Sequence, residues 1–160
     1  MLFHFEYKTF PKGNTERKKR PVMQVTLKAK ENITTDAILD SDSDKTSSHE
    51  LFVRDIGIIF EDAKFRKETE LKTGLPFEDY VIGLNNQPIP VYIVPVQLEI
   101  ANKKITVSVY WIKQNQPFQP EKDFPVILGQ DSVFEIFDVH FSERQRKFFL
   151  NEEKFAPKAD

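Results

Sequence analysis

Residues 37–44 read Ala-Ile-Leu-Asp-Ser-Asp-Ser-Asp, an apolar run that changes abruptly into alternating aspartate and serine. The apolar residues favour a short buried strand, and the polar residues that follow favour a loop. The run therefore predicts a strand that presents Asp40 at its end.

The composition is that of a globular protein. The 160-residue chain is 39% hydrophobic and 30% charged, with 15 Phe and a formal net charge of -2. Its length suits one compact domain. No apolar stretch approaches a membrane span, and Met1–Glu6 does not resemble a signal peptide, so we expect a cytoplasmic protein with no membrane partner. The absence of cysteine excludes disulfides, thiolate zinc sites and a cysteine nucleophile.

Charge gives little support for nucleic-acid binding. The net charge offers no overall attraction to phosphates, and only Arg17-Lys18-Lys19-Arg20 is locally basic. We expect this cluster to be a solvated loop and no nucleic acid to be a partner. A small β-barrel that binds nucleic acid is the alternative, and it depends on this cluster and the aromatic residues alone.

No metal or cofactor is expected. His4, His49 and His140 lack the spacing of paired ligands. The acidic run from Asp40 to Asp44 faintly resembles a calcium loop, but it lacks the glycine and glutamate that an EF-hand needs.

Most of the chain has the period-two pattern of strands. Two helices are expected, one after Ser47-Ser48-His49-Glu50 with Gly57 as its end, and a short one capped by Asp131 or Ser132. We expect loops or turns over 11–20, 31–35, 84–87, 102–104 and 114–123, and a surface excursion over 61–79. The strands are expected over 3–7, 22–28, 37–39, 80–83, 89–100, 105–112, 124–129, 139–141 and 148–150.

These elements, in this order, resemble the retropepsin family, the single-domain aspartic peptidases of retroviruses and of related stand-alone bacterial and archaeal proteins. The resemblance covers roughly residues 20–150, after an N-terminal strand and basic loop over 1–19 and before a polar tail over 151–160. It implies one mostly β domain, a retropepsin-like closed β-barrel with one or two short helices. The segments that carry it are Arg20-Pro21-Val22, Ala37-Ile38-Leu39-Asp40-Ser41, Asp44-Lys45-Thr46, Ile82-Gly83-Leu84-Asn85-Asn86, Val126-Ile127-Leu128-Gly129-Gln130-Asp131, and Phe134, Phe137, Val139 and Phe141.

The resemblance implies hydrolysis of peptide bonds by a homodimer. This chemistry needs two carboxylates that share a proton, and Asp40 supplies only one. The chain has no second run of the Asp-Ser/Thr-Gly type, so each chain would contribute Asp40. Ser41 would connect the two catalytic loops, and a flap over residues 80–96 would close over the substrate. The residues implied to contact substrate are Asp42, Ile82, Gly83, Leu84, Asn85 and Asn86, and those implied to support the catalytic loop are Ile127, Leu128 and Gly129.

Two departures from the family pattern bear on activity. Asp42 occupies a position where the family has glycine, and it adds bulk and negative charge beside the cleaved bond. Asn85 and Asn86 occupy flap positions where glycine is usual, but asparagine tolerates a positive φ and can preserve the turn. The alternative function is therefore a catalytically inactive dimer of the same fold that binds a peptide or a partner protein.

Overall fold

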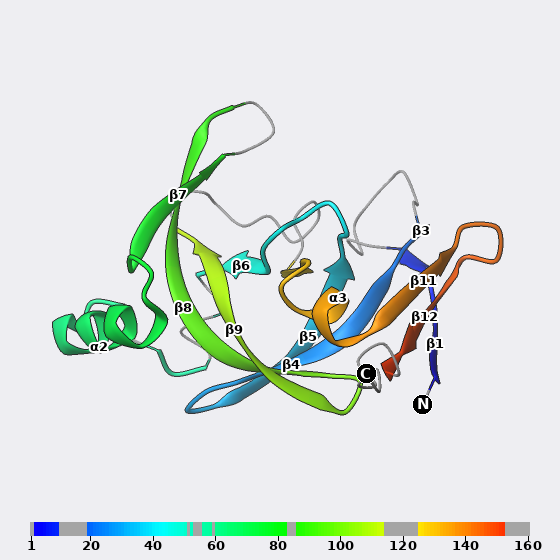
Figure 1. Ribbon diagram of the computed structural model, residues 1–160, viewed down its shortest axis with the longest axis horizontal. Coiled ribbons are helices and arrows are strands. Elements are labelled where there is room, and N and C mark those ends of the chain that lie inside the picture. Colours follow the sequence, from blue (N-terminus) through cyan, green and yellow to red (C-terminus); the bar gives the residue numbers. More distant parts are fainter. Residues whose placement is uncertain are drawn as a thin grey trace, which may run out of the picture.

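The protein is mostly β in the computed structural model, which describes residues 2–9, 19–50, 52, 56–58, 60–82, 86–113 and 125–152 (Figure 1). Two helices are described, α2 (Ala63–Thr73) and α3 (Val133–Ile136). The strands are β1 (Leu2–Glu6), β2 (Lys8–Thr9), β3 (Lys19–Arg20), β4 (Val22–Lys28), β5 (Asn32–Leu39), β6 (Ser47–His49), β7 (Glu78–Ile82), β8 (Pro88–Ile100), β9 (Lys103–Ile112), β10 (Val126–Leu128), β11 (Asp138–Ser142) and β12 (Lys147–Asn151).

Six strands close into a ring. Their order is β4-β5-β10-β6-β9-β8, and β8 pairs back onto β4 through Leu27 and Leu98. β7 extends this sheet from β8, and the β7–β8 hairpin projects beyond the rest of the barrel (Figure 1). The sequence prediction of a closed, mostly β barrel with short helices is thus confirmed.

A second sheet, in the order β1-β12-β11, packs its inner side onto the core. Phe3 and Phe5 of β1 pair with Leu150 and Phe148 of β12. The side chains of Phe3 and Phe5 are half-buried against the core, and Tyr7, which follows β1, is buried. Alternation also holds in β4, where Met23, Val25 and Leu27 are buried. Period-two burial was therefore a sound predictor for these strands because one face of each contacts the core.

The helix expected after Ser47 is wrong over its first residues. Ser47–His49 forms β6, which pairs in parallel with β9 and antiparallel with β10. Ser48 and His49 are buried despite their polarity, so neighbouring strands determine the conformation here and local propensity does not. Of the residues expected on the apolar side of that helix, Leu51 lies outside the described residues, whereas Phe52 is half-buried against the core and Ile56 is fully buried.

Helix α2 was not predicted. Asp62 caps its first turn, accepting hydrogen bonds from the N–H groups of Lys64 (2.9 Å) and Phe65 (3.1 Å), and Gly74 ends it with φ 69°. Thr69 is its one buried residue, so the helix has no apolar stripe that sequence could have revealed. In the described part of the chain, neither helix is long and apolar enough to cross a membrane.

Two turns fall at other residues than expected. The β8–β9 turn is Ala101-Asn102, with φ of 46° and 70°, while Lys103 and Lys104 already belong to β9. Residues 32–35, expected in a turn, belong to β5 because they pair with β4. The expected loop over 114–123 and most of the loop over 11–20 lie outside the described residues.

Candidate active site

Asp40 lies at the end of β5, where the backbone is held by the neighbouring strand β10. The pairing of these parallel strands ends with Leu39 and Leu128, and the next N–H, that of Asp40, donates to the Leu128 carbonyl oxygen (3.0 Å). The Asp40 side chain is half-buried, and its Oδ1 accepts a hydrogen bond from the Asp42 N–H (3.1 Å). This carboxylate is therefore oriented by the backbone of its own loop.

Ser41 and Asp42 are both exposed in the single chain. The carbonyl oxygen of Ser41 accepts a hydrogen bond from the Gln130 side-chain amide (2.8 Å), which joins the loop to the segment after β10. Asp42 binds Asp40 through its backbone N–H, so this contact does not depend on which side chain follows Ser41.

Gly129 lies directly against the loop. A Cβ atom at this position would be 2.5 Å from the carbonyl oxygen of Lys45 and 2.6 Å from that of Ser43. Because both neighbours are backbone atoms, no side chain fits without moving the loop. The next residue, Gln130, donates its N–H to the Ser43 carbonyl oxygen (2.8 Å). Leu128 is fully buried and Ile127 half-buried beneath this contact.

A buried polar network fixes the far end of the loop. Asp131 Oδ1 accepts hydrogen bonds from the N–H (2.8 Å) and the hydroxyl (2.7 Å) of Thr46, and the Gly129 N–H donates to the Thr46 hydroxyl oxygen (3.2 Å). Burial raises the pKa of the half-buried Asp131 carboxyl, although the hydrogen bonds from Thr46 act in the opposite direction. The capping prediction is partly wrong, since Ser132 is the N-cap of α3 but neither it nor Asp131 makes a side-chain cap hydrogen bond.

The candidate flap is the hairpin of β7 and β8. Ile82 pairs with Pro88 at the last described step of the ladder, and its side chain is 69% exposed. Asn86 has φ 58°, so this asparagine adopts the positive φ that it was expected to tolerate in place of glycine. Gly83, Leu84 and Asn85, which were predicted to contact substrate, lie outside the described residues.

The base of this hairpin is tied to two other elements. Glu78 accepts a hydrogen bond from Lys113 Nζ (2.7 Å), just after β9, and lies 3.6 Å from Arg66 of α2. The hydrogen bond from Lys113 lowers the pKa of Glu78. The Arg66 guanidinium lies over the ring of Phe77 (5.0 Å), and Lys113 Nζ lies over that of Tyr92 (4.5 Å). Sequence did not predict this cluster, because α2 was not foreseen.

The described residues bring Asp40, Ser41, Asp42 and residues 127–129 together in one place, with Ile82 and Asn86 on a separate hairpin. Thr46, Gln130 and Asp131 also contact this loop network. All three belong to segments that carried the family resemblance, but none was predicted as a site residue. Among the described residues, no three His, Asp or Glu side chains are grouped so that they could hold a metal ion.

Comparison with known proteins supports the fold. The sequence matches no protein-family model and no curated protein. The structure is similar to the crystal structure of a retropepsin-like aspartic protease from Rickettsia conorii, with a TM-score of 0.56 and 8% sequence identity over 94% of this chain and 91% of that chain.

Two further structures have lower TM-scores. The retroviral protease-like domain of Ddi1 from Leishmania major has a TM-score of 0.45 and 10% identity over 73% of this chain and 77% of that chain. Protein Lpg0085 of unknown function from Legionella pneumophila has a TM-score of 0.41 and 20% identity over 72% of this chain and 85% of that chain. From the Rickettsia match and the ring of strands, the chain has the fold of a retropepsin-like aspartic protease.

Proposed function

We propose that this protein is a retropepsin-like aspartic endopeptidase that acts as a homodimer with one Asp40 from each chain. The observation that carries the proposal is the position of Asp40: it directly follows the barrel strand β5, and its Oδ1 accepts a hydrogen bond from the Asp42 N–H (3.1 Å). The carboxylate is half-buried, and this hydrogen bond orients it, which supports a role in general acid–base catalysis.

The chemistry needs two such groups. Across a two-fold axis the Asp40 carboxylates of two chains share one proton; the ionised one removes a proton from water, and the protonated one polarises the carbonyl of the peptide bond. The β7–β8 hairpin closes over the bound peptide, with Ile82 and Asn86 near its tip. Ser41 connects the two catalytic loops at the dimer axis.

The Asp42 exchange bears directly on this mechanism. The hydrogen bond that orients Asp40 uses the Asp42 backbone, so replacing glycine by aspartate leaves it in place. The exposed side chain adds a negative charge to each loop, and in a dimer two of these charges lie near the axis. This charge favours a second candidate, an inactive dimer of the same fold that binds a peptide or partner protein in its cleft.

The first experiment measures cleavage of a mixed peptide library from about pH 3 to 7. It compares the native chain with Asp40→Asn, Asp42→Gly and a control, Asp36→Asn, which changes a carboxylate of β5 four residues before Asp40. Cleavage that persists in the control and is lost in Asp40→Asn supports the peptidase. No cleavage by the native chain, with activity gained in Asp42→Gly, supports the binding module.

The shared site has a separate test. When native and Asp40→Asn chains are mixed in equal amounts and allowed to exchange partners, about one quarter of random dimers keep two intact aspartates. Activity at constant total protein should then fall to about one quarter of the native value. A fall to only about one half would mean that each chain acts alone.

A further inference from the structure

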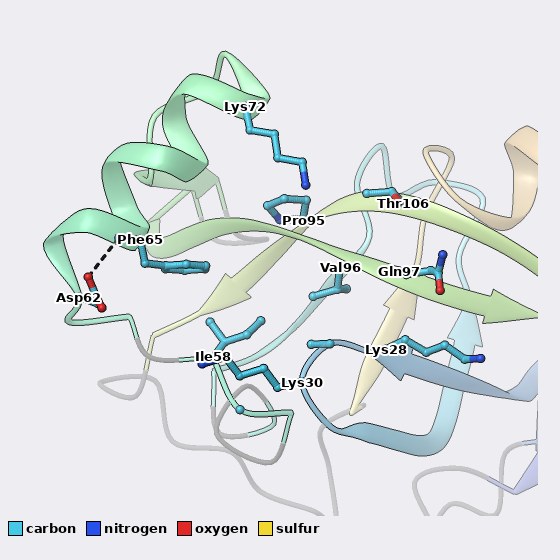
Figure 2. A pocket seen from close by; sticks show the side chains of 12 residues that line it. Lys28, Lys30, Ile58, Asp62, Phe65, Lys72, Pro95, Val96, Gln97 and Thr106 are labelled. Carbon is cyan, nitrogen blue, oxygen red and sulfur yellow. Dashed lines mark hydrogen bonds between the residues drawn. The ribbon is translucent and has the colours of Figure 1, made fainter.

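A cavity of about 410 Å3 lies between helix α2, the turn after β4 and the adjoining strands β8 and β9 (Figure 2). This size is within the range of small-ligand pockets, which hold about 300–1,000 Å3. None of the described residues that line it belongs to the Asp40 loop or to the segment after β10. The cavity is therefore separate from the site proposed for peptide cleavage.

One wall of the cavity is apolar. Phe65 points from α2 into the space between the helix and β8, and Ile58, Pro95 and Val96 line the same space (Figure 2). Val96 is buried, whereas Phe65, Ile58 and Pro95 are only half-buried. A ligand with an apolar body would remove this partly exposed surface from water, and such burial is favourable.

The rim of the cavity carries positive charge. Lys72 extends from the last turn of α2 toward Pro95, and Lys30 follows β4 on the other side (Figure 2). Neither lysine forms an ion pair within the described residues, in contrast to Lys28, which lies 2.6 Å from Glu99.

Among the described residues that line the cavity, Asp62 is the one acidic residue. Its carboxylate already accepts two backbone N–H groups at the start of α2. Because Lys72 lies ten residues further along this helix, about 15 Å separates the two along its axis. The Lys72 end of the cavity is therefore cationic.

The backbone fixes the position of Lys30. The Glu31 N–H donates to the Ile56 carbonyl oxygen (3.2 Å), which joins the turn after β4 to the turn that contains Gly57. Gly57 has φ 79°, and a Cβ atom there would lie 2.9 Å from Lys30 Cβ and 3.4 Å from its Cδ. The stem of Lys30 therefore lies directly over a glycine that has both a conformational and a steric reason to be glycine.

We propose that this cavity binds a small anionic ligand with an apolar body. Its body lies against Phe65, Ile58, Pro95 and Val96, and its anionic group is attracted by the rim lysines Lys30 and Lys72, which flank the cavity on opposite sides (Figure 2). The charge of the rim and the apolar wall together define this class of ligand. A carboxylate or a phosphate monoester on an aromatic or aliphatic body satisfies both requirements.

The test uses two dyes with related naphthylamine bodies. 8-Anilinonaphthalene-1-sulfonate carries a sulfonate, and N-phenyl-1-naphthylamine lacks it. Fluorescence titration should show that the anionic dye binds one site with at least about tenfold higher affinity than the neutral dye, and that raised salt weakens its binding. Equal affinity for the two dyes, or no binding of the anionic dye, would overturn the proposal.

Variants of the two rim lysines test whether Lys30 and Lys72 attract the anionic dye. Lys30→Gln and Lys72→Gln should each weaken binding of the anionic dye about threefold, and the double variant about tenfold. The control is Lys67→Gln, which removes an exposed lysine of the same helix that does not line this cavity. An equal effect of the control and rim variants would show that only general charge attraction is measured and would contradict the proposal.

Two readouts locate the ligand and identify its anionic group. Methyl NMR signals of Ile58 and Val96 should shift on titration, while those of Ile33, on β5 and outside the cavity lining, should not. Displacement of the dye by 1-naphthoate or 1-naphthyl phosphate supports the proposal, and the stronger competitor indicates the preferred anion. Shifts confined to other methyl groups, or displacement by neither competitor, would refute it.

Discussion

Asp131 and Thr46, which are 85 residues apart in sequence, are joined by two hydrogen bonds to a single carboxylate oxygen, one from the Thr46 N–H (2.8 Å) and one from its hydroxyl (2.7 Å). Thr46 is fully buried. The pair connects the end of the Asp40 loop to the start of α3, so the loop is held at both ends: at Asp40 by Leu128 and at Thr46 by Asp131.

Removing the Asp131 carboxylate should destabilise the fold. Asp131→Leu leaves the buried Thr46 N–H without an acceptor, whereas the Thr46 hydroxyl still lies 2.8 Å from the Ser132 hydroxyl. We expect a loss of about 2 kcal/mol in the free energy of unfolding, measured by urea denaturation. Asp131→Asn keeps an oxygen that can accept both hydrogen bonds and should cost less than half as much. Equal losses in the two variants would contradict the assignment.

The same residue predicts a pH dependence. Burial raises the pKa of Asp131 above its ordinary value of 3.8, so the folded chain binds this proton more readily than the unfolded chain. Its contribution to stability is therefore present in full below about pH 3.8 and is lost as the pH rises through the folded pKa.

Asp131→Asn does not titrate at this position, so its stability relative to the native chain should increase as the pH is raised from about 3 to 7. Urea denaturation of both chains at several pH values in this range measures the difference. A difference that stays constant, or that decreases with rising pH, would refute the prediction.

Gly129 and Gly74 require glycine for different reasons: Gly129 has no space for a side chain, whereas Gly74 has a positive φ. Gly129→Ala places a Cβ atom 2.5 Å from backbone oxygen, so the Asp40 loop must move, and we expect a loss of about 3 kcal/mol or more. Gly74 has φ 69° with no atom within 4 Å of an added Cβ, so Gly74→Ala should cost only about 1 kcal/mol for the backbone conformation. Thermal and urea unfolding of both variants test this order, and the reverse order would show that the loop yields easily.

The barrel could be predicted where burial is one-sided. β4, β8 and β9 alternate between buried and exposed residues, and this alternation is visible in sequence. β6 could not be predicted, because three polar residues form a strand only through their pairing with β9 and β10. Helix α2 was missed for the opposite reason: its residues are mostly exposed, and Leu71 is 79% exposed, so no apolar face marks it.

In the candidate site too, local features could be predicted from the sequence, but contacts between distant residues could not. The end of a strand at Asp40 is a local feature, and the structure places it as the sequence suggested. The hydrogen bonds from Gln130 to Ser41 and from Thr46 to Asp131 join residues 89 and 85 positions apart through polar side chains, and no periodicity reports such contacts. Lys30 and Lys72 share a cavity only because α2 packs near β8 and the turn after β4, so their relationship requires the tertiary structure.

A buried tyrosine directly after β1 predicts loss of stability at high pH. The Tyr7 hydroxyl donates to Glu143 Oε1 (3.0 Å), and the side chain is 6% exposed. Burial, together with the hydrogen bond to Glu143 and its negative charge, raises the pKa of Tyr7 to about 12. Because the raised pKa favours the neutral form in the folded state, this contribution is complete below about pH 10 and is lost as the pH rises to about 12.

Tyr7→Phe removes both the hydrogen bond and the titration. At pH 8 the native chain should be more stable than this variant by about 1 kcal/mol, the net value of a typical hydrogen bond. The advantage should shrink as the pH rises above about 10, because the unfolded native chain then releases the Tyr7 proton while the folded chain still retains it. The variant has no such proton. Urea denaturation of both chains at pH values from 8 to about 11 measures the difference.

Tyr80→Phe, at a side chain that is 65% exposed, serves as the control and should change stability little. An advantage of native Tyr7 that grows with pH would mean that the buried hydroxyl ionises readily, and the role assigned to Glu143 would be wrong.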